Sequence, residues 1–116
     1  MNELIVKIFV KIISLEELQN IINSINFRNK YSFEIDILKN NDFDESKSKE
    51  YPDGFLYFPF VIEYFSNEIF NDADIYNTKI ILEKLWENNF PAIAACDYEN
   101  KLPENGGYNS HNIPWR

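Results

Sequence analysis

The sequence predicts an α+β fold, a two-layer sandwich in which two helices cover one face of a four-stranded antiparallel sheet. Two observations indicate it. Apolar residues alternate with period two in several segments, and they recur at helical spacing in two others. These segments follow one another as β-α-β, a loop, and a second β-α-β, which is the ferredoxin-like order. That arrangement places the first and third strands at the centre of the sheet.

The first half of the chain supplies a strand, a helix and a second strand. Residues 4–13 alternate, and one face is wholly apolar: Leu4, Val6, Ile8, Val10 and Ile12. Serine followed three residues later by glutamate at 14–17 fits a capping box, and the apolar spacing that follows predicts a helix over 15–26. Residues 31–38 alternate again, which predicts a strand with one solvated face.

The second half begins with a charged segment, residues 40–54, where we expect a mobile loop. The aromatic segment 55–65 predicts the third strand. Pro59 has no backbone N–H, so this strand should begin near Phe60, or the proline should lie at a bulge. The alternation suggests one face shared by Phe58, Phe60, Ile62 and Tyr64.

The second helix is predicted to begin at a cap on Asn71 or Asp72 and to end at the Asn88-Asn89 pair, since Pro91 stops it. The small residues at 92–98 predict a short last strand, and the tail from about residue 99 has no periodicity. We found no domain linker, and 116 residues suit a single domain spanning 1–116.

Composition limits the function. Hydrophobic residues make up 45% of the chain, enough for a core. A sole cysteine cannot form an internal disulfide, so a reducing compartment is the default. The N-terminus lacks the features of a signal peptide and the length of a membrane span. We therefore expect a cytoplasmic protein without a membrane partner.

The net charge of −8 is unevenly distributed. Residues 1–40 carry five basic and five acidic residues, whereas residues 41–116 carry six basic and fourteen acidic ones. An acidic surface repels phosphate backbones, so nucleic acid is disfavoured as a partner. The same surface would attract a basic protein and speed its association.

Candidate chemistry is sparse. Cys96, Asp97 and His111 together suggest a nucleophile, but Cys96 continues the alternation of the last strand, which predicts a buried structural cysteine. The acidic clusters at 42–45 and 72–74 do not match the calcium-binding loop, and the latter suits a helix N-terminus. We expect no catalytic residue, cofactor or metal site.

The remaining signal is aromatic residues among carboxylates, a composition typical of protein interfaces. It occurs where the charged loop meets the third strand, and again in the tail. The predicted partner-binding residues are Asp42, Asp44, Glu45, Tyr51, Asp53, Asp97, Tyr98, Glu99, Glu104, Tyr108 and Trp115.

The second half also resembles a family of small bacterial immunity proteins. Three features carry the resemblance: the aromatic Tyr57-Phe58-Pro59, the helix over 75–89, and the stretch from Ala94 to Gly107 with its Cys-Asp-Tyr-Glu, Leu-Pro and Gly-Gly pairs. Such proteins accompany polymorphic toxins, including those of contact-dependent growth inhibition systems. The resemblance implies a cytoplasmic toxin inhibitor that binds and neutralises a cognate toxin domain, often a nuclease.

Two alternatives stay open. One is a small enzyme that uses Cys96, Asp97 or His111. The other is a small-molecule-sensing regulatory domain, which the ferredoxin-like layout also permits. The sequence indicates neither the oligomeric state, nor the toxin, nor which surface would bind it.

Overall fold

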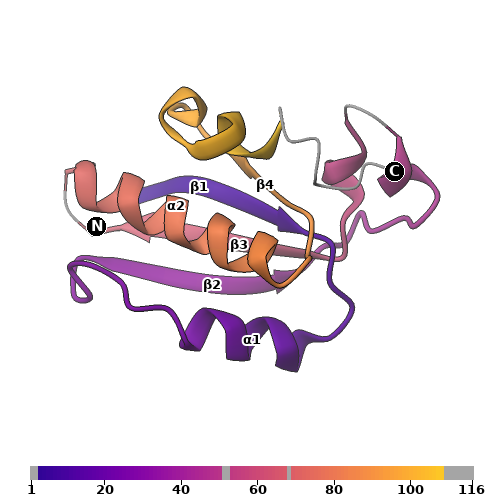
Figure 1. The fold of residues 1–116 in the computed structure, drawn as a ribbon, viewed down its shortest axis with the longest axis horizontal. Helices are drawn as coiled ribbons and strands as arrows, with labels where there is room; N and C mark the ends of the chain where they lie inside the picture. Colours follow the sequence, from indigo (N-terminus) through magenta and orange to yellow (C-terminus); the bar gives the residue numbers. More distant parts are fainter. Residues whose placement is uncertain (1–2, 51–52, 68, 109–116) are drawn as a thin grey trace.

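The computed structural model describes residues 3–50, 53–67 and 69–108. Its four strands form one antiparallel sheet in the order β2-β3-β1-β4, with β1 and β3 at the centre (Figure 1). The strands are Glu3–Val10 (β1), Phe33–Lys39 (β2), Phe60–Ser66 (β3) and Ala92–Ala95 (β4). The predicted α+β, ferredoxin-like arrangement is confirmed.

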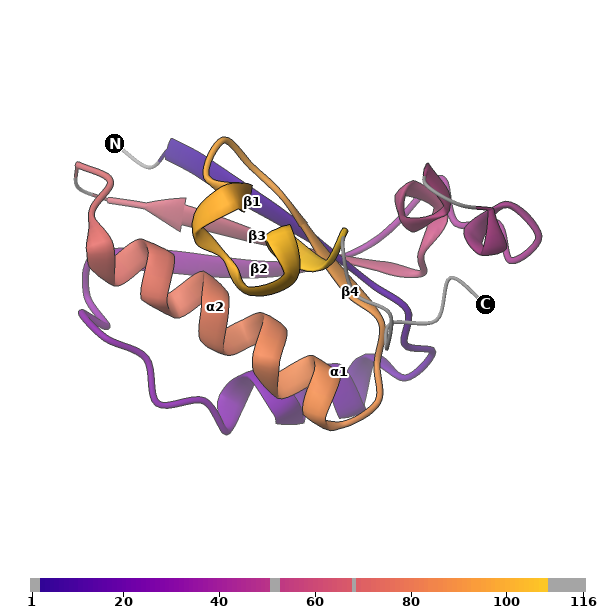
Figure 2. The same ribbon diagram turned by 45° about the horizontal axis from the view of Figure 1, so that its top comes forward.

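Two helices, Leu15–Asn23 (α1) and Asp72–Glu87 (α2), lie on the same face of the sheet (Figures 1 and 2). Between helices and sheet lies the main core, to which α1 contributes Leu18 and Ile22 and to which α2 contributes Ile81, Leu82 and Leu85. In the described part of the chain, no helix is long and apolar enough to span a membrane.

Local hydrogen bonds set the ends of α1. Ser14 accepts a hydrogen bond from the Glu17 amide at 3.2 Å, as the capping pattern predicts. The helix ends at Asn23, three residues before the predicted end at 26. The Ser24 hydroxyl donates to the Ile21 carbonyl at 2.6 Å, and a serine bonded in this way competes with helix continuation.

The start of α2 is a reciprocal capping box. Asn71 accepts from the Ala73 amide at 2.8 Å, and the Asp74 carboxylate accepts from the Asn71 amide at 3.1 Å. The predicted cap at Asn71 is confirmed.

Two predictions about strand faces are wrong. Leu4 pairs with Phe65 and Val6 with Tyr64, so Ile5 is an extra residue in β1. This bulge turns Leu4 outward, where it is 40% exposed, and lets Ile5 pack against the core instead.

The other correction concerns Phe58. The third strand begins at Phe60, as Pro59 predicted, and the Pro59 carbonyl accepts from the Asn40 amide at 2.8 Å. Phe58, which precedes the proline, does not share a face with Tyr64. It packs with Phe55 and Ile93 in a second cluster, on the side of the sheet away from the helices.

The segments expected to be irregular contain short 3₁₀ helices. The 40–54 segment and its continuation hold Lys47–Lys49 (η1) and Asp53–Tyr57 (η2), and the tail holds Glu99–Lys101 (η3) and Pro103–Gly107 (η4). The last strand stops at Ala95 instead of 98, because the chain turns away from the sheet into η3.

Candidate interaction surface

The tail passes from one face of the sheet to the other. On the helix face, Tyr98 and Leu102 belong to the main core, and the Tyr98 hydroxyl lies 2.9 Å from the Thr78 hydroxyl of α2. Beyond η4, Tyr108 packs with the second cluster on the opposite face, where its ring centroid lies 5.3 Å from that of Phe55. The tail therefore runs around β4, the edge strand.

A left-handed turn makes this passage. Glu104, Asn105 and Gly106 have φ angles of 55°, 52° and 73°. Non-glycine residues in this region cost roughly 1–2 kcal/mol each, so packing must hold the turn in place. A Cβ on Gly106 would lie 3.1 Å from the Ala94 carbonyl oxygen, which leaves little room for any other residue.

The segment between β2 and β3 is held by backbone contacts. The Asn40 side-chain amide donates to the carbonyls of Leu56 and Phe58, at 2.9 and 2.7 Å. Gly54 packs against η1 so closely that a Cβ would lie 2.6 Å from the Ser48 carbonyl oxygen. These contacts fix η2 over the outer face of the sheet, with Phe55 beneath it.

The contact between Phe55 and Tyr108 brings two distant parts of the sequence together. Burial raises the pKa of the Tyr108 hydroxyl. The Glu99 carboxylate accepts a hydrogen bond from this hydroxyl and raises the pKa further, and Asp53 has a weaker effect in the same direction. Asp53 of η2 and Glu99 of η3 therefore both act on one tyrosine. We use the name Tyr108 surface for Asp53, Glu99 and Tyr108 together with the exposed Asp97, which acts on the neighbouring Cys96 thiol.

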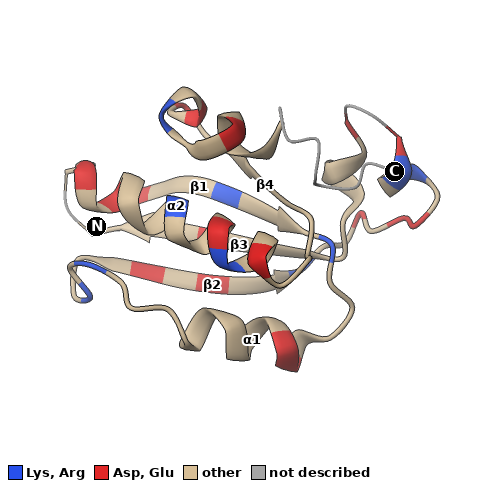
Figure 3. Cartoon of the chain, viewed as in Figure 1, with Lys and Arg blue, Asp and Glu red and all other residues tan. Residues whose placement is uncertain are grey.

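Charge on this side of the molecule is mainly acidic. Residues 40–57 contain five acidic and two basic residues, and residues 96–108 contain three acidic and one basic. Figure 3 shows acidic positions both in the turns after β4 and in the segment that joins β2 to β3. Asp53, Asp97 and Glu104 are exposed, and Glu99 is half-buried.

The predicted partner-binding residues include exposed, half-buried and buried side chains, and some lie outside the described residues. Tyr98 is only 6% exposed, so its side chain is a core element, contrary to the prediction of a surface contact. Asp44 is half-buried and accepts from the Lys47 amide at 3.1 Å, which makes it part of the η1 turn. Asp42 and Glu45 are exposed in the same segment. Tyr51, Trp115 and the proposed catalytic His111 lie outside the described residues.

Cys96 has the environment of an unreactive thiol. Burial raises its pKa to about 11, and the nearby Glu99 and Asp97 carboxylates contribute to the rise. The Glu99 carboxylate also accepts from the Cys96 amide at 3.1 Å. A thiol with this pKa is protonated at neutral pH and is a poor nucleophile. Within the described ranges, no group of three or more His, Cys, Asp or Glu residues could hold a metal ion.

A groove of about 560 Å³ lies on the outer face of the sheet, beside η2. Phe9, Leu56, Tyr57 and Val61 provide apolar walls, and the polar lining consists of Lys7, Lys47, Asn40 and Asp42. Lys7 pairs with Glu63 at 3.7 Å, and Lys47 lies 5.2 Å from the centre of the Tyr57 ring. Sequence reasoning missed this groove because its residues come from β1, β3 and the intervening segment.

A buried polar network was also missed. The Tyr64 hydroxyl donates to the Asp74 carboxylate at 2.7 Å and accepts from the Asn77 amide at 3.1 Å, and all three residues are at most 2% exposed. Burial raises the pKa of Tyr64, so its hydroxyl keeps the proton that it donates. The network has no opening to solvent and ties the start of α2 to β3, which is a structural role. In the sequence, Asp74 was identified only as part of the acidic cluster at 72–74, which suits a helix N-terminus.

Comparisons with known proteins add no relatives: no protein family, no curated protein and no solved structure matches the chain.

Proposed function

We propose that the chain is an immunity protein that binds and neutralises a basic bacterial toxin domain, of which a nuclease is one example. The observation that carries the proposal is the Tyr108 surface, where the Phe55–Tyr108 ring contact joins η2 to the tail and the Glu99 carboxylate accepts a hydrogen bond from the Tyr108 hydroxyl. The half-chain resemblance to immunity proteins supports the same function. It implies a cytoplasmic setting, a protein partner and no reaction of the chain's own.

Electrostatics explain how such a protein would act. The active cleft of a nuclease must attract phosphate, so it is rich in Lys and Arg. An acidic surface with a tyrosine at its centre could fill that cleft, with oppositely charged surfaces steering the encounter. Tyrosine is enriched among the residues that contribute most binding energy at interfaces.

The test is co-expression and co-purification with the product of the gene immediately upstream. Toxicity of that product alone, relieved by this chain, and a complex at micromolar concentrations are the expected results. Lysine at Asp53 and Asp97 should slow association strongly at low salt. A matched control is the pair Glu16→Lys and Glu87→Lys, two exposed helix positions with the same charge change. The proposal is wrong if the upstream gene product is not toxic, if the two proteins do not bind, or if association slows equally in the two double variants.

The outer-face groove favours a second candidate, a ligand-sensing regulatory domain. Two lysines beside aromatic and aliphatic walls suit a small ligand with an anionic group and an apolar body. A series of aromatic carboxylates should then raise the melting temperature in a concentration-dependent way, and Lys47→Ala should remove the effect. Unchanged melting across the series would leave the groove without this role.

A further inference from the structure

The second edge of the sheet, β2, differs from the β4 edge because no described part of the tail runs around it. Among the described strands β2 pairs only with β3. The backbone amide of Asn40 donates to the Pro59 carbonyl, and the Ser32 carbonyl accepts from the backbone amide of Asn67. Because hydrogen-bonded positions alternate along an antiparallel pair, the even-numbered residues of β2 bond to β3 and the odd-numbered ones do not. Phe33, Ile35 and Ile37 therefore direct their backbone N–H and C=O groups away from β3, toward the open side of the sheet.

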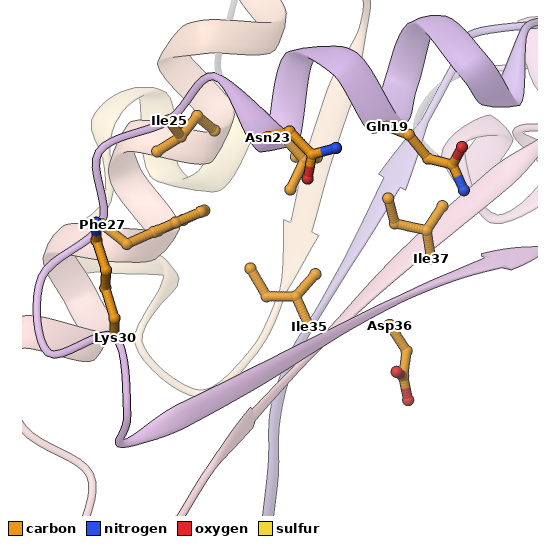
Figure 4. Close-up of a pocket in the computed structure, with 9 residues that line it drawn as sticks. Gln19, Asn23, Ile25, Phe27, Lys30, Ile35, Asp36 and Ile37 are labelled. Carbon is orange, nitrogen blue, oxygen red and sulfur yellow. The ribbon is translucent and has the colours of Figure 1, made fainter.

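A groove lies directly beneath this edge. It measures about 560 Å³ and is bounded by α1, by the turn that follows α1 and by β2. Its apolar walls include Ile22, Ile25, Phe27, Ile35 and Ile37. Figure 4 shows Ile35 and Ile37 pointing toward α1, whereas Asp36 points to the other face. Ile35 and Ile37, two of the three residues with outward-directed backbone groups, thus also line the groove.

Charge on the other face of β2 indicates what would fit. Asp36 lies opposite Glu63 of β3, and Glu63 lies opposite Lys7 of β1. Adjacent carboxylates directly opposite one another are destabilising in a sheet. A cation on a fifth strand, opposite Asp36, would offset this repulsion, because each of the two carboxylates would then have a cation on its other side.

A second copy of the chain fits this edge poorly. The antiparallel register that pairs the whole of β2 with its equivalent places Asp36 opposite Asp36. An extended segment that alternates Lys or Arg with aliphatic residues meets both requirements. Its aliphatic side chains enter the groove, and its cations face Asp36 and the exposed Glu34.

We propose that β2 is a docking edge for an extended, basic segment of a partner protein, which adds to the sheet as a fifth strand. This surface lies at the edge opposite β4 and the tail, so the inference is independent of the Tyr108 surface and of toxin neutralisation.

The test uses the full chain and a seven-residue peptide that alternates valine with lysine, at 150 mM salt to screen non-specific attraction. Binding with a Kd below about 1 mM is expected, with amide NMR shifts confined to β2 and the groove. Asp36→Lys should weaken binding at least tenfold and should instead bind the corresponding valine–glutamate peptide. Asp97→Lys, the same change on the Tyr108 surface, should leave peptide binding unchanged.

A backbone variant gives a second readout. Ile37→Pro removes an outward-directed N–H without touching the ladder to β3, at a position where a strand tolerates proline, and should abolish binding of the valine–lysine peptide. If this variant fails to fold, the binding measured for Asp36→Lys still tests the proposal. No binding at 1 mM, shifts centred on residues 42–45, or equal affinity of Asp36→Lys would overturn the proposal. So would a dimer that Ile37→Pro dissociates, since the occupant would then be a second copy.

Discussion

Replacing Tyr64 by Phe tests the buried network that joins α2 to the sheet. The change removes one hydroxyl and leaves the ring, which stacks on Phe33 at a centroid distance of 5.0 Å. Asp74 then loses its 2.7 Å donor but keeps the Asn71 amide at 3.1 Å, and Asn77 keeps its bond to the Arg28 carbonyl at 2.9 Å. The Asn71 amide bonds to Oδ2 of Asp74, so Oδ1 loses the donor that Tyr64 supplied, and the loss is at least that of one hydrogen bond to a charged group.

Such a bond contributes roughly 1.5–3 kcal/mol, and the weaker bond to Asn77 is partly offset by the more apolar ring. We expect the free energy of unfolding to fall by about 2 kcal/mol, a large share of the 5–15 kcal/mol typical of a domain. Urea unfolding followed by circular dichroism measures it. The matched control is Tyr31→Phe, where the side chain is 98% exposed and the change should stay within about 0.5 kcal/mol. A Tyr64→Phe effect as small as the control would refute the network's role.

Three further predictions concern stability. Gly106→Ala should destabilise the chain by about 1–3 kcal/mol in urea unfolding, because a residue with φ of 73° gains a Cβ only 3.1 Å from the Ala94 carbonyl oxygen; Gly→Ala effects below 0.5 kcal/mol would contradict it. Asn71→Ala should cost about 1 kcal/mol by removing the helix cap, while Asn71→Ser should restore most of it. The folded-state pKa of Cys96, about 11, lies above the usual 8.5 of an unfolded thiol, so its contribution to stability is present below pH 8.5 and is lost as pH rises toward 11. Wild type should therefore lose stability relative to Cys96→Ala over this window, with a slope of at most about 1.4 kcal/mol per pH unit; parallel curves would show that the thiol titrates normally.

Local signals predicted the fold well. The alternation of β2 and β3, the Asn71 cap and the position of Pro59 depend on neighbours a few residues apart, so the sequence displays them directly. The bulge at Ile5 was not visible, because Leu4, Ile5 and Val6 are all apolar and give no sign of which one is extra. The face of Phe58 was predicted wrongly for a related reason. The apolar alternation in the sequence continues through Pro59, whereas the strand begins only at Phe60.

The candidate surface was predicted only in its parts. Acidic residues around Asp53 and Glu99 could be identified from charge, but their common electrostatic effect on Tyr108 depends on how the tail packs against Phe55. The burial of Tyr98 was missed because its partner, Thr78, lies on a helix whose contact with the tail no spacing rule reveals. Long-range packing of this kind requires the three-dimensional structure.

The route of the tail around β4 has a consequence for how specificity could diversify. Because Tyr108 and Phe55 share one cluster, the acidic positions of η2 and of the tail are mechanically joined. A graft that exchanged only one of these segments between related proteins would separate a ring contact as well as alter charge. A functional chimera must therefore carry both segments from the same protein. Chimeras that exchange η2 and the tail together should fold, whereas chimeras that exchange only one of them should lose stability.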